Sequence, residues 1–110
     1  MDKTHYFYVL HCADQTFYGG YTVDLERRSK EHNSGKGAKY TRPNYRRPVR
    51  MIYAEAYTTR SEAMSAEYRF KAEKRPNKEK YLAERGIRFP LQKSQAIVIQ
   101  NEGGKQDESK

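Results

Sequence analysis

Two short runs of aromatic and aliphatic residues near the N-terminus predict a pair of β-strands. The first spans residues 6–12 and the second spans residues 17–21, with a mainly polar stretch between them. Aromatic and β-branched side chains fit a pleated, half-buried surface, so the pattern predicts a β-hairpin. Gly19 and Gly20 interrupt the second run. They indicate either an ordinary hairpin end or a place where another backbone or a ligand comes close.

The pattern over residues 22–33 predicts a helix with an unusual face. Thr22 is the expected N-cap, and the acidic residues of the following turn suit the positive end of the helix dipole. Arg28 and His32 share a helix face with Leu25, so the core-facing stripe becomes cationic along its length. A charged helix face is usually solvated. The alternative is that Arg28 and His32 point into a cleft.

Residues 34–48 are rich in Gly, Lys, Arg and Pro, and they predict a long basic loop. The mixture of cations and tyrosines suits nucleic acid, because cations contact phosphates and tyrosine rings stack on bases. A loop that only confers solubility is the alternative. The candidate nucleic-acid-binding residues are Lys36, Lys39, Tyr40, Arg42, Arg46 and Arg47.

A third strand is predicted over residues 49–57, where the side chains alternate and an acidic Glu55 is included. Further on, Pro76 is expected to end a helix, and Asn77 is expected to cap a short helix over residues 78–85.

Between these elements, residues 59–62 match a capping box, Thr-Arg-Ser-Glu, that opens a helix to about residue 74. Its apolar stripe runs from Ala63 to Phe70 and includes Glu67, so one carboxylate stands among the positions that should face the core. Glu67 is therefore a candidate for chemistry. An ion pair with Lys71 on the helix surface is the alternative.

The C-terminal part carries weaker patterns. The apolar residues 96–99 are consistent with a further strand, and the polar residues 101–110 are predicted to be disordered. We expect one domain over residues 1–85 and a tail over residues 86–110.

Composition narrows the functional classes. A chain of 110 residues forms one domain, and its net charge of +8 favours a polyanionic partner, because cations that meet phosphates release counterions. A basic protein without any nucleic-acid function is the alternative. Cys12 is the only cysteine, which excludes an internal disulfide and a thiolate zinc cluster and fits the cytoplasm. No apolar run is long enough to cross a membrane, so no membrane partner is expected.

Taken in order, the residues resemble the GIY-YIG nuclease superfamily, in particular its small stand-alone bacterial proteins. Residues 6–8, Tyr-Phe-Tyr, are similar to the first motif, and residues 18–20, Tyr-Gly-Gly, are similar to the second. The ordered matches extend over about residues 5–80. Tyr6 stands where the first motif usually has Gly, and Gly19 stands where the second usually has Ile.

This resemblance implies an α/β (α+β) domain with a three-stranded antiparallel sheet flanked by helices. It also implies a metal-dependent endonuclease that hydrolyses phosphodiester bonds in DNA, of a structure-selective repair or recombination type. The implied partner is nucleic acid, DNA rather than RNA, and no organic cofactor is expected. The implied catalytic residues are Tyr8, Tyr18, Arg28, His32 and Glu67.

Each of these residues has an expected role. Glu67 would bind one Mg²⁺ or Mn²⁺ ion, since a hydrated hard cation needs only one or two carboxylates. Tyr8 would orient or deprotonate the attacking water, provided that cations such as Arg28 lower its pKa. Tyr18 would assist in the same site. Arg28 would stabilise the phosphoryl transition state, and His32 would relay a proton or hold a phosphate oxygen.

Asn77 and Lys71 are two further candidates near the edge of this site. Two other functions stay open: a catalytically silent nucleic-acid-binding module with the same fold, and a protein-interaction domain.

Overall fold

The computed structural model describes residues 3–92 and 96–101, which form a mixed α/β domain. The elements in chain order are β1 (His5–His11), β2 (Phe17–Thr22), α1 (Leu25–Asn33), the 3-10 turn η1 (Asn44–Arg46), β3 (Arg50–Tyr57), α2 (Arg60–Ala72), α3 (Arg75–Glu84) and β4 (Val98–Asn101). The predicted fold class is confirmed. The predicted disorder of the C-terminal end falls mainly on residues 102–110, which lie outside the described residues.

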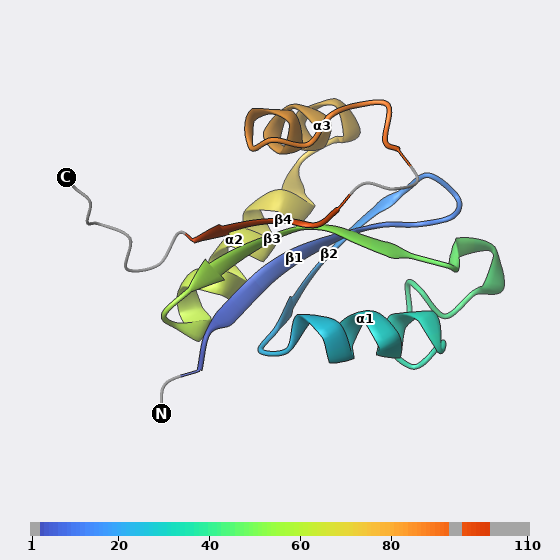
Figure 1. The fold of residues 1–110 in the computed structure, drawn as a ribbon, viewed down its shortest axis with the longest axis horizontal. Helices are drawn as coiled ribbons and strands as arrows, with labels where there is room; N and C mark the ends of the chain where they lie inside the picture. Colours follow the sequence, from blue (N-terminus) through green and yellow to red (C-terminus); the bar gives the residue numbers. More distant parts are fainter. Residues whose placement is uncertain (1–2, 93–95, 102–110) are drawn as a thin grey trace.

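The sheet has four strands in the order β2-β1-β3-β4 (Figure 1). β1 pairs antiparallel with both β2 and β3, as predicted. The expected number of three strands is wrong by one, because β4 adds to the open edge of β3 in parallel register. Ile87 is also buried in the core. Part of the segment 86–110 is therefore packed on the folded body.

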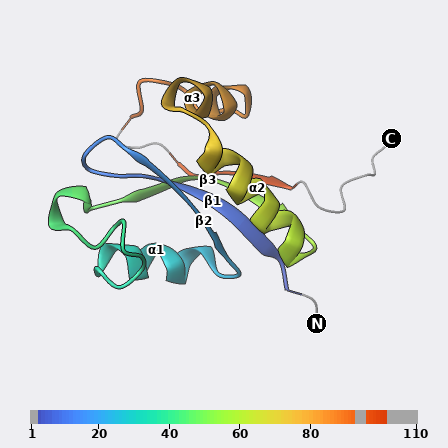
Figure 2. The same cartoon turned by 180° about the vertical axis from the view of Figure 1, so that it is seen from behind.

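Helices cover both faces of the sheet. Figure 1 shows α1 and α3 on opposite sides, and Figure 2 shows α2 crossing the strands on the side of α3. Since successive side chains of a strand point to opposite faces, Phe7 and Val9 of β1 face α2 and α3, whereas Tyr8 and Leu10 face α1 and the basic loop. Both faces of β1 are thus buried. β1 can therefore hold a polar side chain out of contact with bulk water.

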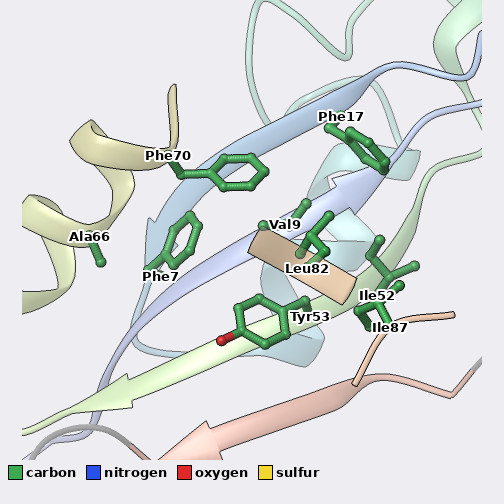
Figure 3. Packing of buried hydrophobic residues seen from close by; sticks show 9 residues of the cluster. All are labelled: Phe7, Val9, Phe17, Ile52, Tyr53, Ala66, Phe70, Leu82 and Ile87. Atoms are coloured by element: carbon green, nitrogen blue, oxygen red, sulfur yellow. The ribbon is translucent and has the colours of Figure 1, made fainter. Parts of the chain in front are cut away.

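The larger core cluster lies between the sheet and the pair α2 and α3. In Figure 3, Phe70 of α2 lies beside Phe7 of β1, with ring centroids 5.4 Å apart. The buried members are Phe7, Val9, Phe17, Ile52, Tyr53, Ala66, Phe70, Leu82 and Ile87.

These phenylalanines explain why glycine is accommodated at position 19. A Cβ on Gly19 would lie 3.2 Å from the Phe70 ring and 3.3 Å from the Phe7 ring. Two large rings occupy the space that the usual Ile of the motif would fill, and β2 runs unbroken through both glycines.

A buried carboxylate stands at the edge of this cluster. Glu55 of β3 is 1% exposed, and its oxygens accept hydrogen bonds from the hydroxyls of Tyr53 and Tyr57, both at 2.6 Å, and from that of Tyr81. Nε of Arg85 lies 3.6 Å away. Burial of this charge is thereby compensated, and α3 is tied to the sheet.

The helix starts follow side-chain capping. Thr59 caps α2 as predicted, with its Oγ1 accepting from the Glu62 N–H at 3.2 Å. The prediction that Thr22 caps α1 is wrong, because Asp24 accepts from the Arg27 N–H at 3.0 Å. Thr22 belongs to the end of β2 and accepts from the Asp24 N–H instead.

The boundary between α2 and α3 also differs from the prediction. α2 ends at Ala72, and Pro76 lies in the first turn of α3, where its missing N–H is not needed. Asn77 is therefore not the cap of α3. No helix of the described residues is long and apolar enough to cross a bilayer.

Candidate active site

Tyr8 is the centre of a buried group of polar side chains. Its side chain is fully buried, and its hydroxyl oxygen lies 2.7 Å from Nε2 of His32 and 3.1 Å from Nε of Arg28. The strand register places Gly20 of β2 directly opposite Tyr8. A Cβ at Gly20 would overlap the Tyr8 hydroxyl, so the second glycine of the Tyr-Gly-Gly motif makes room for this phenol.

His32 in the last turn of α1 is fully buried, in contrast to a solvated helix face. Its Nδ1 lies 2.7 Å from the Thr41 hydroxyl, which lies 3.3 Å from the Ala38 carbonyl oxygen. A Cβ on Gly37 would come within 2.6 Å of His32 Nδ1. The basic loop therefore passes directly over the imidazole and closes it off from solvent.

The positions of the hydrogen atoms in this group follow from which atoms can donate and which can accept. A guanidinium only donates, so the Tyr8 oxygen accepts from Arg28 and its own hydrogen is available to His32 Nε2. Burial, followed by the charge of Arg28, lowers the pKa of His32 to about 4, so the ring is neutral near pH 7. We infer that His32 carries its proton on Nδ1 and donates it to Thr41, whose hydroxyl donates to Ala38.

The charge state of Tyr8 differs from the expectation. Burial raises the pKa of Tyr8 above its usual range, and the hydrogen bond and charge of Arg28 offset only part of this effect. The nearby Tyr18 and Glu67 raise the pKa further. The expectation that Arg28 brings the Tyr8 pKa down is thus not met in the free protein. Tyr8 is a neutral phenol in this arrangement.

Tyr18 contacts both the buried polar residues around Tyr8 and a residue of α2 on the other side of β2. Its ring packs edge-on against His32 at a centroid distance of 5.4 Å and stacks on Tyr40 of the basic loop at 5.5 Å. The ammonium group of Lys71 lies 5.3 Å from its ring centroid. The candidate residue Lys71 therefore lies beside the candidate residue Tyr18.

Glu67 lies one helical turn before Lys71 on α2. Its side chain is 16% exposed, and its Oε2 is 3.0 Å from Lys71 Nζ, so the ion pair considered from sequence is present. Its negative charge is nevertheless close enough to raise the pKa of Tyr8. Oε1 accepts no hydrogen bond from any described residue.

The donor set around Glu67 fits only a largely hydrated ion. In the described ranges, no three His, Cys, Asp or Glu side chains gather closely enough to hold a metal. A single carboxylate beside phosphate oxygens and water is a recognised environment for Mg²⁺, whereas Zn²⁺ needs three or four protein ligands.

Arg28 keeps part of its guanidinium available. Nε donates to Tyr8, and NH1 donates to Glu31 at 3.0 Å, while the side chain stays 26% exposed. The NH2 group and one NH1 hydrogen remain to contact an anion. Glu31 was missed at the sequence level, although its spacing of three residues from Arg28 on one helix is a signal for such a pair.

The cationic residues of the basic loop form two groups: some support the loop through hydrogen bonds, and the others are exposed. Arg46 donates to Asp14 at 3.0 Å and to the Tyr40 carbonyl at 3.0 Å, and its guanidinium lies 3.8 Å from the Tyr40 ring centroid. Arg47 donates to the Arg42 carbonyl at 2.8 Å. These two arginines brace the loop.

The other cations of this loop, Lys36, Lys39 and Arg42, are exposed. Asn77 is also exposed, on α3, and its amide donates to Glu73 of the preceding turn at 2.9 Å, so the hydrogen bond of Asn77 is made away from the Tyr8 group. Thr41 was not a predicted site residue, because a single hydroxyl residue in a basic loop gives no periodic signal.

Comparison with known proteins found a matching family and similar bacterial proteins. Residues 4–81 match the family model described as GIY-YIG catalytic domain. The chain is 55% identical over 87 residues to a UPF0213 protein of Lactiplantibacillus plantarum, covering 79% of this chain and 86% of that protein. It is 62% identical over 80 residues to a UPF0213 protein of Enterococcus faecalis, covering 73% and 91%.

Two solved structures are also similar. The solution NMR structure of a protein from E. faecalis is 59% identical, with a TM-score of 0.53, and the match covers 76% of this chain and 90% of that chain. That of a UPF0213 protein from Bacillus halodurans is 46% identical, with a TM-score of 0.51, covering 76% and 86%. The match to the family model and these similar small bacterial relatives show that the chain belongs to the GIY-YIG family.

Proposed function

We propose that the protein is a metal-dependent endonuclease that hydrolyses phosphodiester bonds in DNA. The observation that carries the proposal is the hydrogen-bonded series Arg28, Tyr8, His32 and Thr41, in which Arg28 is partly exposed and the other three are buried. Burying the polar side chains of Tyr8, His32 and Thr41 costs stability unless every donor and acceptor is satisfied, and a fold could fill this space more simply with apolar residues. Their retention beside a carboxylate supports a chemical role.

The protein's own residues supply three functions in this proposal. Arg28 directs its remaining N–H groups to non-bridging phosphate oxygens and stabilises the extra charge of the transition state. Tyr8, held neutral between Arg28 and His32, orients the attacking water. His32 takes up the Tyr8 proton through Nε2 when Tyr8 receives a proton from that water. Tyr18 lines the same site.

Glu67 is the residue that would hold one Mg²⁺ or Mn²⁺ ion, with water and phosphate oxygens as the other ligands. When bound, such an ion lowers the pKa of a coordinated water and neutralises developing charge on the phosphoryl group. The Oε1 atom of Glu67, which accepts no hydrogen bond from a described residue, is compatible with this role.

The proposed substrate class is DNA of particular structure, as in repair or recombination, and the proposed location is the cytoplasm. The net charge of +8 and the exposed cations Lys36, Lys39 and Arg42 support a polyanionic partner. The proposed nuclease domain is residues 1–85, followed by the tail over residues 86–110. No organic cofactor enters the scheme.

A catalytically silent nucleic-acid-binding module with the same fold is the second candidate. The ion pair between Glu67 and Lys71 favours it, because the lysine occupies one of the two oxygens that a metal would use. The two candidates agree on DNA binding and differ on metal binding and cleavage.

One experiment separates them. Duplex, single-stranded and branched DNA and matching RNA are incubated with Mg²⁺, Mn²⁺ or EDTA and with wild-type protein, Glu67→Gln or Glu26→Gln. Glu26 pairs with Lys30 four residues later on α1, as Glu67 does with Lys71, so Glu26→Gln is a matched control. We expect defined, metal-dependent cuts in DNA with wild type and Glu26→Gln, and none with Glu67→Gln.

Binding of Mn²⁺, followed by its EPR signal, provides a readout that does not depend on activity. Glu67→Gln should abolish site-specific Mn²⁺ binding. Binding and cleavage that are equal in wild type and Glu67→Gln would exclude the metal assignment, and DNA binding without cleavage under any condition would favour the silent module.

A further inference from the structure

Three cations from α2 and α3 line the outer edge of the sheet beside the candidate active site. We call this surface the β2-edge patch, and it consists of Lys71, Arg75 and Lys78 with the aromatic residues Phe17 and Tyr40. It includes a shallow pocket of about 230 Å³ lined by Thr16, Phe17, Tyr40, Arg75 and Lys78. None of the motifs identified in the sequence includes Arg75 or Lys78.

Each cation is held in place over an aromatic ring. The Arg75 guanidinium lies 4.3 Å from the Phe17 ring centroid, and the Lys78 ammonium lies 5.5 Å from that of Phe70. Lys71 lies 5.3 Å from the Tyr18 ring. Such contacts fix the charged groups at the surface and reduce the entropy lost when an anion binds.

The patch carries uncompensated positive charge. Arg75 pairs with Glu79 at 2.8 Å and Lys71 pairs with Glu67, but Lys78 forms no ion pair with any described residue. Burial lowers the pKa of Lys78, and the charges of Arg75 and Lys71 lower it further. Arg75 and Lys71 therefore both repel the Lys78 ammonium group. An anion bound between Arg75 and Lys78 would relieve that repulsion.

The position of the patch favours a polymer over a small anion. Arg75 lies over Phe17 of β2, the strand that also carries Tyr18. Lys71 contacts Tyr18 and Glu67, so it connects the patch to the candidate active site. Tyr40 connects the pocket to the basic loop. A row of cations that starts at the reacting centre matches the repeating phosphates of a DNA strand.

We propose that Arg75 and Lys78 bind a DNA backbone phosphate that flanks the scissile phosphate. The assignment rests on the proposed function for the identity of the DNA, and it adds a binding site on α3 that the basic loop does not provide. Because these contacts reach only phosphate, they contribute affinity and orientation and no sequence preference.

Fluorescence anisotropy with labelled single-stranded and duplex DNA tests this site in EDTA, where no cleavage takes place. The variants are Lys78→Gln and Lys78→Arg, with Lys80→Gln as the control, because Lys80 is an exposed lysine on the same helix. We expect Lys78→Gln to weaken binding by about fivefold or more and to lower the slope of log affinity against log salt by about one. Lys78→Arg should restore both values, and Lys80→Gln should match wild type.

The length of the DNA gives a second criterion. The effect of Lys78→Gln should be present for a decanucleotide and absent for a dinucleotide, whose single internucleotide phosphate leaves no flanking phosphate when it occupies the active site. Equal losses in Lys78→Gln and Lys80→Gln, or an effect that is independent of length, would overturn the assignment.

The result of this binding test does not depend on whether the protein cleaves DNA. If the protein cleaves nothing but Lys78→Gln shows the expected loss of binding, the proposed function fails and the binding site stands. If cleavage is observed and Lys78→Gln binds and cuts as wild type does, the binding site fails and the proposed function stands. Tighter binding of matching RNA than of DNA would overturn the DNA assignment.

Discussion

The hydroxyl of Tyr8 lies 2.7 Å from Nε2 of His32, although 24 residues separate the two in the chain. One side chain comes from the central strand and the other from the last turn of α1, and the basic loop closes over both through Thr41. The phenol and the imidazole consequently behave as one unit. A change in the charge of either alters the hydrogen-bonding capacity of the other.

The protonation state of His32 is the first prediction. Two-dimensional ¹⁵N NMR should show a neutral ring with the proton on Nδ1 near pH 7, and protonation only near pH 4, because burial and Arg28 lower its pKa to about 4. A ring that titrates near 6.5, or one protonated on Nε2, would contradict the proposed direction of the hydrogen bonds.

The same shift predicts a loss of stability in acid. The unfolded chain protonates this histidine near its ordinary pKa of 6.5, whereas the folded protein does so only near 4. Stability from His32 is therefore complete above about pH 6.5, declines as the pH falls towards 4, and by then has lost about 3 kcal/mol. Urea unfolding of wild type and His32→Gln across this range should show a smaller decline in the variant.

Arg28→Lys should reduce turnover much more than DNA binding. Lysine cannot donate to Tyr8 and to a phosphate in the planar arrangement of a guanidinium, so we expect kcat to fall by about 100-fold or more with little change in affinity. Arg27→Lys is the control, since Arg27 is an exposed neighbour that pairs with the same Glu31. Equal activity of the two variants would exclude Arg28 from the transition state.

Gly20→Ala should destabilise the protein and displace Tyr8. The added methyl group would overlap the hydroxyl and ring of the fully buried Tyr8, so we expect a loss of about 2 kcal/mol in unfolding free energy. Gly19→Ala is the comparison. Its Cβ would lie 3.2 Å from Phe70, which requires only a small shift and a smaller loss. A larger loss in Gly19→Ala would show that Tyr8 is not confined by Gly20.

Glu55→Ala should be among the most destabilising substitutions outside the candidate site. It would leave three tyrosine hydroxyls and the nearby Arg85 without their shared buried acceptor, at a cost of about 3–5 kcal/mol. Glu84→Ala is the matched control, because Glu84 is 57% exposed and also lies near Arg85, and we expect a change within about 0.5 kcal/mol. Denaturant unfolding measures both. Similar values for the two variants would show that Glu55 contributes little to stability.

The local elements could be predicted because their determinants lie within a few residues of one another. The alternating aromatic runs gave β1 and β2, and the Thr59 to Glu62 capping box gave the start of α2. The wrong predictions concern helix boundaries. Asp24 caps α1 instead of the predicted Thr22, and Pro76 lies in the first turn of α3 instead of ending a helix.

The sequence by itself determined the family, the main strands and helices, and the identity of the candidate chemical residues. Tertiary structure decided the parallel addition of β4, the burial of His32 and Glu55, and the use of Arg46 and Arg47 as loop supports. It also decided that burial outweighs Arg28 in setting the pKa of Tyr8. The physical reason is that capping and periodicity act between near neighbours in the chain. Burial, charge proximity and hydrogen-bond closure depend on which distant segments the folded chain brings together.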